Sequence, residues 1–221
     1  MLSIVRLASN EANKAEEAAK KGADVVVVDG ADEGKLKDFA KKAPNVPLGV
    51  LLRHKSEREN VASLREAGAD FIVLEAESGL AEALLEENIG FVLVARGQAE
   101  DTSLRLLGDL GLDALITSVP DGAFTIERLL SLRRLSALAR TPLFVEAPPD
   151  ADAARLQALR DSGVAGVIID GSSLGKLERL RATIAALPPR GRRREERGEA
   201  MLPAAAVAAG HDHDEDDFDD D

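Results

Sequence analysis

Eight short runs of apolar, largely β-branched residues recur along the chain, separated by longer segments with helical spacing. They are Ile4 to Ala8, Val25 to Asp29, Leu48 to Leu52, Phe71 to Leu74, Phe91 to Ala95, Ala114 to Thr117, Leu143 to Val145 and Val167 to Ile169. Such runs indicate strands buried on both faces, and their alternation with helices indicates βαβ units in a parallel sheet. We therefore predict an α/β protein built as a single compact (βα)₈ barrel, or TIM barrel; the alternative is a doubly wound open parallel sheet.

An internal repeat favours closure of the barrel. Its four copies are Gly22 to Val25, Gly68 to Phe71, Gly111 to Ala114 and Gly163 to Gly166, which start 46, 43 and 52 residues apart. This period is the length of two βα units, so the chain reads as four quarter-barrels. In each copy, we expect the glycine to end a helix and the following residues to start an even-numbered strand.

Helix starts are also marked in the sequence. Ser56 and Glu59 have the spacing of a capping box, and Asp150 precedes an apolar pattern through Leu156 and Leu159. We therefore expect Ser56 and Asp150 to be N-terminal caps.

Charged and polar residues stand at or near the carboxyl end of each predicted strand. In strand order they are Arg6, Asp29, Arg53, Glu75, Arg96, Ser118, Glu146 and Asp170. Active sites of (βα)₈ barrels form at this end, so the functional interpretation is a pocket for a small anion. In that pocket the arginines, Ser118 and Glu146 bind substrate, and Asp29, Glu75 or Asp170 moves a proton or holds Mg²⁺. The structural interpretation is a ring of ion pairs that needs no ligand.

Several kinds of chemistry are excluded or disfavoured by composition. The chain has no Cys, Tyr or Trp, and His54 is its only histidine before the C-terminal tail, which excludes nucleophilic triads and imidazole-rich metal sites. We expect His54 to be a solvated loop residue. No strand run ends in lysine, so a Schiff base would require Lys55 or Lys176 from a loop or helix, which is a poor fit.

The last quarter of the chain resembles a known superfamily. Leu143 to Asp150, the helix pattern after Ala153, and Gly163 to Leu174 resemble the phosphate-binding (βα)₈ barrels, which include barrels of tryptophan and histidine biosynthesis. The resemblance implies that Gly171, Ser172 and Ser173 present backbone N–H groups to a phosphate. The preceding strand departs from the pattern, because Ala147-Pro148-Pro149-Asp150 stands where the superfamily has glycines, and two prolines remove N–H donors.

The chain divides by composition into residues 1–187, the predicted barrel, and residues 188–221, a charged tail. Residues 190–221 hold 5 Arg against 11 Asp and Glu, too polar a composition to order itself, so we expect the tail to be disordered. The formal net charge of −12 and the scarcity of aromatic residues argue against a nucleic-acid partner. No apolar run is long enough to cross a membrane, and the absence of cysteine favours the cytoplasm.

Two functions are compatible with these patterns. The first is an enzyme, a lyase or isomerase acting on a small anionic metabolite, with Arg53 and Arg96 as anchors and Asp29 or Glu75 as base. The second is a non-catalytic barrel that acts as a binding or scaffold protein, with the acidic tail as its interaction element. If the ring of charges is structural, loss of Arg53 should destabilise the barrel by a few kcal/mol, because Asp29 and Glu75 would lose their partner.

Overall fold

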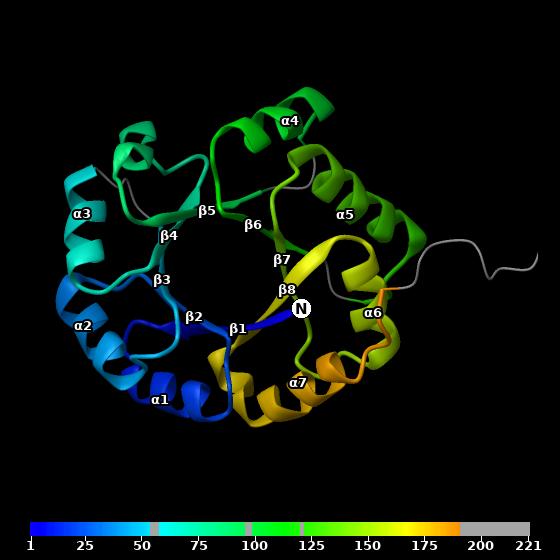
Figure 1. Cartoon of the computed structure of the whole chain (residues 1–221), viewed down its shortest axis with the longest axis horizontal. Helices are drawn as coiled ribbons and strands as arrows, with labels where there is room; N and C mark the ends of the chain where they lie inside the picture. The colour runs from blue at the N-terminus through cyan, green and yellow to red at the C-terminus, as the bar shows by residue number, and fades with distance from the viewer. Residues whose placement is uncertain (54–57, 96–98, 120–121, 191–221) are drawn as a thin grey trace, which may run out of the picture. The chain divides into compact units, whose positions relative to one another are not determined.

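A computed structural model describes residues 1–53, 58–95, 99–119 and 122–190. Eight parallel strands form a closed barrel in sequence order (Figure 1). They are β1 (Leu2–Ala8), β2 (Val25–Asp29), β3 (Leu48–Leu52), β4 (Phe71–Glu75), β5 (Gly90–Val94), β6 (Ala114–Ser118), β7 (Leu143–Glu146) and β8 (Val164–Asp170). The first strand pairs with the last, with Ile4 opposite Ile168. This pairing confirms the (βα)₈ barrel and excludes the open sheet.

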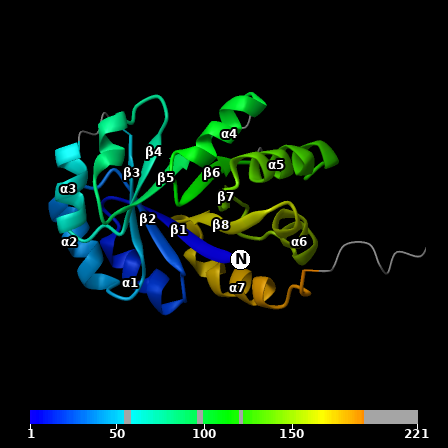
Figure 2. The same cartoon turned by 45° about the horizontal axis from the view of Figure 1, so that its top comes forward.

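Helices surround the barrel and connect its strands (Figures 1 and 2). They are α1 (Ala12–Lys20), α2 (Glu33–Lys42), α3 (Arg58–Glu66), α4 (Asp101–Asp109), α5 (Ile126–Ala139), α6 (Ala153–Asp161) and α7 (Leu177–Ala185). The connection from β4 to β5 differs from the others, because it contains only a 3₁₀ helix, η1 (Ala81–Leu85). A second 3₁₀ helix, η2 (Gly171–Lys176), follows β8 and leads into α7. The ring of helices is therefore thinnest at β4 and β5.

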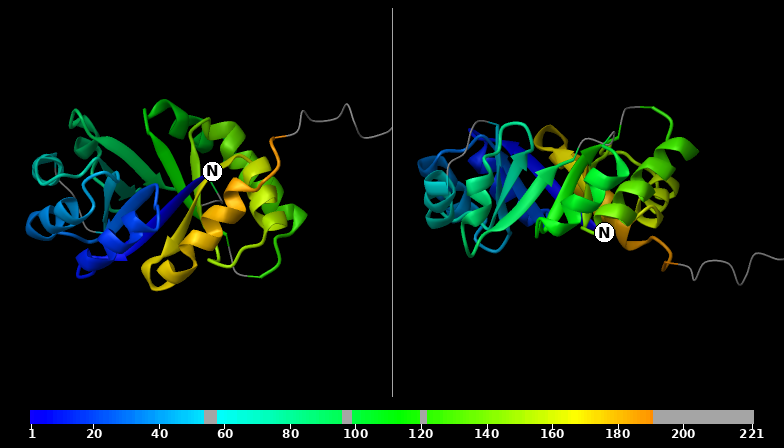
Figure 3. Two further views of the ribbon diagram at one scale, coloured as in Figure 1. Left: turned by 60° about the horizontal axis from the view of Figure 1, so that its bottom comes forward. Right: turned by 90° about the horizontal axis from the view of Figure 1, so that it is seen from above.

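Residues alternate between the inside of the barrel and the helix layer along each strand. The inward-facing core consists of Ile4, Val27, Leu51, Val73, Val92, Ala114 and Ile168. A larger core lies between the strands and the helices; Figure 3 shows these helices on the outside of the strands. Glycine makes room for a large side chain inside: a Cβ at Gly49 would lie 2.2 Å from the Phe71 ring. The alternation also determines which strand-terminal residues face the mouth.

The sequence repeat lies at the amino-terminal end of the barrel, where its residues end helices and bond strand starts. Its first residues, Gly22, Gly68, Gly111 and Gly163, all have positive φ, as expected for glycines that end helices. In three copies the third residue is an aspartate that bonds the start of the preceding odd-numbered strand. The backbone N–H groups of Ser3, Leu48 and Phe91 donate to Asp24, Asp70 and Asp113, each at 2.8 Å. The fourth copy has Ala165 at this position.

One predicted cap is wrong. The N-cap of α6 is Asp152, whose side chain accepts a hydrogen bond from the Arg155 N–H at 2.8 Å. Asp150 lies in the preceding turn and instead pairs with Lys176 at 3.6 Å. The helix begins at Ala153, so only Asp152 has the extended backbone from which a side chain reaches the first-turn N–H groups. The predicted capping residue Ser56 lies outside the described residues.

The contacts along the chain separate one compact unit, Met1–Pro189, from the remainder, Arg190–Asp221. Residues 191–221 lie outside the described part of the chain, so the disordered tail and its boundary at residue 187 stay predictions. Among the described helices, none has the length and apolar character of a membrane span.

Candidate functional site

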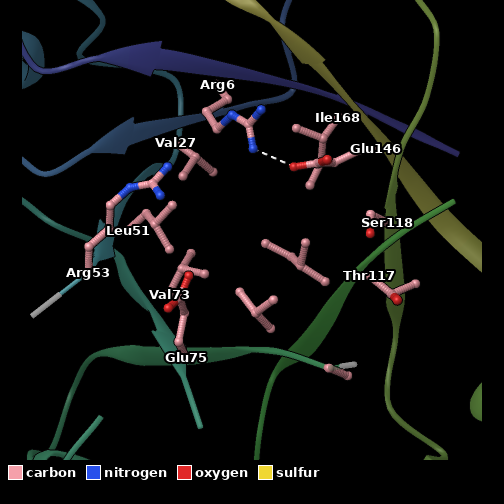
Figure 4. Close-up of a pocket in the computed structure, with 13 residues that line it drawn as sticks. Arg6, Val27, Leu51, Arg53, Val73, Glu75, Thr117, Ser118, Glu146 and Ile168 are labelled. Atoms are coloured by element: carbon pink, nitrogen blue, oxygen red, sulfur yellow. Dashed lines mark hydrogen bonds and ion pairs between the residues drawn. The ribbon is translucent and has the colours of Figure 1, made fainter. Parts of the chain in front are cut away.

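A cavity of about 460 Å³ lies at the carboxyl-terminal mouth of the barrel. Inward-facing apolar side chains form its floor, and strand-terminal polar side chains surround it (Figure 4). It is lined by Arg6, Val27, Leu51, Arg53, Val73, Glu75, Val94, Ala95, Ile116, Thr117, Ser118, Glu146 and Ile168. Five of the eight residues predicted from strand ends, namely Arg6, Arg53, Glu75, Ser118 and Glu146, are thus brought together around one space.

Arg53 is held by Asp29 from the neighbouring strand. Its Nε and Nη2 atoms donate to the two carboxylate oxygens of Asp29 at 2.7 and 2.5 Å, a bidentate pair. These hydrogen bonds lower the pKa of Asp29 and raise the pKa of Arg53. The pair is solvated, since 54% of the Arg53 side chain and 25% of the Asp29 side chain are exposed.

Arg6 forms the second ion pair of the mouth, in which its Nη1 atom donates to Oε1 of Glu146. Arg6 lies on β1 and Glu146 on β7, so the pair reaches past β8, which stands between these strands. The predicted ring of charges between neighbouring strands is therefore only partly realised. Arg53 pairs with Asp29 on the neighbouring strand, whereas Arg6 pairs with Glu146 across one strand (Figure 4).

Glu75 differs from the other carboxylates of the mouth. Within the described parts of the chain, no hydrogen bond or ion pair engages its carboxylate, and Arg53 acts on it only through space. Its side chain points into the cavity from the end of β4, below Arg53 (Figure 4). Val73 and Val94 lie beside it in the cavity wall. Among the described residues, Glu75 is thus a carboxylate that faces the cavity and has no hydrogen-bond partner.

Asp170 and the turn after β8 have local partners. Oδ1 of Asp170 accepts the Ser172 N–H at 2.9 Å, which makes Asp170 the N-cap of η2. That bond and a further one to the Ser172 side chain lower the pKa of Asp170. The turn also faces a second carboxylate, because a Cβ at Gly171 would lie 3.3 Å from Oε2 of Glu11. None of Asp170, Gly171, Ser172 and Ser173 lines the cavity, so their catalytic and phosphate-binding roles stay predictions.

Other predicted residues fall outside the described ranges or away from the cavity. Arg96, His54 and Lys55 lie outside the described residues. Lys176, in η2, pairs with Asp150. The described residues contain no group of three or more His, Cys, Asp or Glu side chains arranged to hold a metal ion, so the Mg²⁺ prediction gains no support from them.

Two contributions to the barrel were not predicted from the sequence. Thr117 lines the cavity beside Ser118, although its position next to a strand end gave no signal for this. The aspartates of the repeat were also missed, and here a signal existed, because Asp24, Asp70 and Asp113 recur at one position in three of the four copies.

No family model matches the chain, and no curated protein matches it. Solved structures do match. The 3-keto-L-gulonate-6-phosphate decarboxylase from Vibrio cholerae has a TM-score of 0.68 and 16% identity over 86% of this chain and 100% of that one. The chain shares the (βα)₈ barrel fold with this structure. KGPDC from Streptococcus mutans aligns over the same shares of both chains with a TM-score of 0.66 and 11% identity.

A mutant tryptophan synthase alpha-subunit from Pyrococcus furiosus gives a similar result. It aligns over 84% of this chain and 97% of that one, with a TM-score of 0.64 and 14% identity. These structures are TIM barrels, in agreement with the predicted (βα)₈ fold. At such low identities the similarity establishes the fold, and the function has to be argued from the site.

Proposed function

We propose that the barrel mouth binds a small anionic metabolite and that the protein is a lyase or isomerase in which Glu75 transfers a proton. The observation that carries this proposal is the position of Glu75, a carboxylate without a hydrogen-bond or ion-pair partner among the described residues, which faces a cavity also lined by two guanidinium groups. A carboxylate beside an anchored anion has the arrangement needed to remove a proton from a substrate carbon. The solved structures that match include a decarboxylase whose name specifies a phosphorylated sugar acid.

Arg6 and Arg53 are the proposed anchors. The Nε and Nη2 atoms of Arg53 donate to Asp29. Among the described residues, no hydrogen bond from the Nη1 atom of Arg53 is found. Each guanidinium therefore keeps donors for a phosphate or carboxylate. The described mouth also carries the carboxylates of Asp29, Glu75 and Glu146, which suit a ligand with hydroxyl donors beside its anionic group.

Glu75 fits the role of base better than the other two predicted carboxylates. The pKa of Asp29 is lowered by Arg53 and the pKa of Asp170 by Ser172, so both are held in the charged form and are weaker proton acceptors. In the described structure Glu75 lacks such a hydrogen-bond partner, which leaves it the proton-transfer role.

Anion binding is tested by thermal unfolding with inorganic phosphate, malonate and Mg²⁺. A ligand at 100 times its Kd adds about 2.7 kcal/mol to the free energy of unfolding. We expect phosphate or malonate to raise the melting temperature of the native protein and of an Arg181→Met control. Arg181 lies on α7 and pairs with Asp24, at the opposite end of the barrel. The double variant Arg6→Met, Arg53→Met should lose the increase, and its retention would refute the proposed anchors.

Proton transfer is tested separately with dihydroxyacetone phosphate as probe, by proton NMR in D₂O. We expect the protein to accelerate exchange of the hydrogens next to the carbonyl. Glu75→Gln should abolish this acceleration and keep the melting-temperature increase with phosphate. Glu82→Gln, on the exposed surface of η1, should change neither. Equal exchange rates with Glu75→Gln and the native protein would remove Glu75 from the mechanism.

One observation favours the second function, a non-catalytic binding or scaffold barrel. Arg6 and Arg53 are both already paired with carboxylates, so these charges are satisfied without a ligand. If no anion changes the melting temperature, the mouth is a structural feature and the scaffold function is the better explanation.

A further inference from the structure

A second cavity, of about 250 Å³, adjoins the mouth between β5 and α4. It is lined by Glu75, Ala76, Glu77, Leu93, Val94, Ala95, Ala99, Ser103 and Leu107. Glu75, Val94 and Ala95 also line the mouth cavity, so these three residues form the border between the two spaces. The proposed proton-transfer residue therefore stands at the junction of both.

The fold explains why this space exists. The helix layer is thin here, because η1 replaces an α-helix between β4 and β5. The next helix, α4, lies along α5 (Figure 2): Asp101 pairs with Arg134 at 2.5 Å, and a Cβ at Gly108 would lie 2.5 Å from a backbone oxygen of α5. Leu104 is the one buried residue of α4. This helix therefore covers β5 incompletely.

Leu93 shows the consequence on the strand itself. Its side chain belongs to the outward-facing set of β5 and is only half-buried. On the neighbouring strands, the outward-facing Ile72 and Leu115 are fully buried. A leucine on a central strand with part of its surface uncovered can gain free energy from an apolar ligand group.

We propose that the substrate carries an uncharged apolar arm, which this second cavity takes up while the anionic group binds Arg6 and Arg53. The inference rests on the proposed anion site and adds the class of substrate. Six of the nine lining residues are alanine, valine or leucine, which matches an alkyl or aryl group. Glu75 at the border of the cavity would repel a second anionic group, so the arm is uncharged.

The test uses a series of alkylphosphonates, from methyl to butyl to hexyl, with Kd measured by isothermal titration calorimetry. Each methylene that the cavity takes up should lower Kd about fourfold. Ser103→Phe fills the cavity from an exposed helix position, and Ser131→Phe, on the exposed surface of α5, is the matched control. Circular dichroism and melting temperature verify that both variants are folded.

In the native protein and in Ser131→Phe, we expect Kd to fall as the alkyl chain lengthens. In Ser103→Phe, Kd should fall less than twofold from methylphosphonate to hexylphosphonate. Methylphosphonate should bind all three proteins equally and compete with inorganic phosphate. If methylphosphonate binds but longer chains gain nothing, or if Ser103→Phe keeps the gain, the arm cavity is refuted and the anion site stands. If methylphosphonate does not bind, the anion site fails and the inference fails with it.

Discussion

The two ends of the barrel use carboxylates in opposite ways. At the amino-terminal end, the same contact occurs three times. Asp24, Asp70 and Asp113 each accept a 2.8 Å hydrogen bond from a backbone N–H at the start of a neighbouring strand. At the carboxyl-terminal end, Asp29 and Glu146 bind arginines from different directions, and Glu75 has no partner in the described structure. At one end the described carboxylates make one repeated hydrogen bond. At the other end their partners differ, and Glu75 has none among the described residues.

This difference separates stability from function. A contact that recurs in three of the four quarters of the barrel serves the frame that these quarters share, whereas a ligand is asymmetric and needs different groups at each strand end. In (βα)₈ barrels, the amino-terminal end is associated with stability and the carboxyl-terminal end with activity. We therefore expect substitutions at the two ends to have different effects.

The largest effect on stability is expected for Asp24→Ala. Oδ2 of Asp24 accepts both the N–H and the hydroxyl of Ser3, at 2.8 and 2.7 Å, and Ser3 is 1% exposed. Removing the carboxylate leaves two buried donors unpaired, which should lower the free energy of unfolding by about 2–3 kcal/mol. Urea unfolding measures this loss. Asp109→Ala, at the exposed end of α4, should change it by less than about 0.5 kcal/mol.

A smaller effect is expected for Arg53→Met at the mouth. Because more than half of the Arg53 side chain is exposed, the pair with Asp29 should contribute about 1 kcal/mol or less at neutral pH. The sequence predicted a loss of a few kcal/mol if the ring is structural. If Arg53→Met loses more than about 3 kcal/mol of unfolding free energy, the ring of ion pairs is structural. The two ends of the barrel would then not differ in their contribution to stability.

The same variant has a defined pH dependence. Arg53 lowers the pKa of Asp29 in the folded protein below its ordinary value of 3.8. The stabilisation is therefore complete above that value and disappears as the pH falls through the lower folded-state pKa. Unfolding curves of the native protein and Arg53→Met should differ at pH 6 and converge in acid. A difference that grows as the pH falls would contradict the pairing.

The smallest effect is expected for removal of the tail. A chain that ends at Pro189 keeps the whole compact unit, so its melting temperature and circular dichroism per folded residue should equal those of the full chain. A decrease of several degrees would show that residues beyond Pro189 stabilise the barrel, and the boundary would be wrong.

Much of the fold was predictable, because strands buried on both faces leave a direct pattern in the sequence. All eight strands were predicted. The bounds of β2 and β3 match, and the ends of the others differ by at most three residues; β8, for example, starts at Val164 instead of Val167. The short η1 was not predicted, since an apolar pattern does not separate one turn of 3₁₀ helix from an α-helix.

The site was predictable only in part. The positions at strand ends predicted that Arg6, Arg53, Glu75, Ser118 and Glu146 lie at the mouth, and all five line one cavity. The sequence did not predict that Arg6 reaches past β8 to Glu146, or that Asp170 turns back to cap η2. These choices depend on barrel tilt and side-chain rotamers, which have no periodic signal in the sequence.

The most direct test of the contrast is urea unfolding with and without inorganic phosphate at saturating concentration, on three proteins. For the native protein, phosphate should raise the unfolding midpoint. Asp24→Ala should have a lower midpoint and the same phosphate increase, whereas the double variant Arg6→Met, Arg53→Met should have a midpoint lowered less than that of Asp24→Ala and no increase. If the double variant keeps the phosphate increase, or Asp24→Ala loses it, the assignment of stability to one end and ligand binding to the other is wrong.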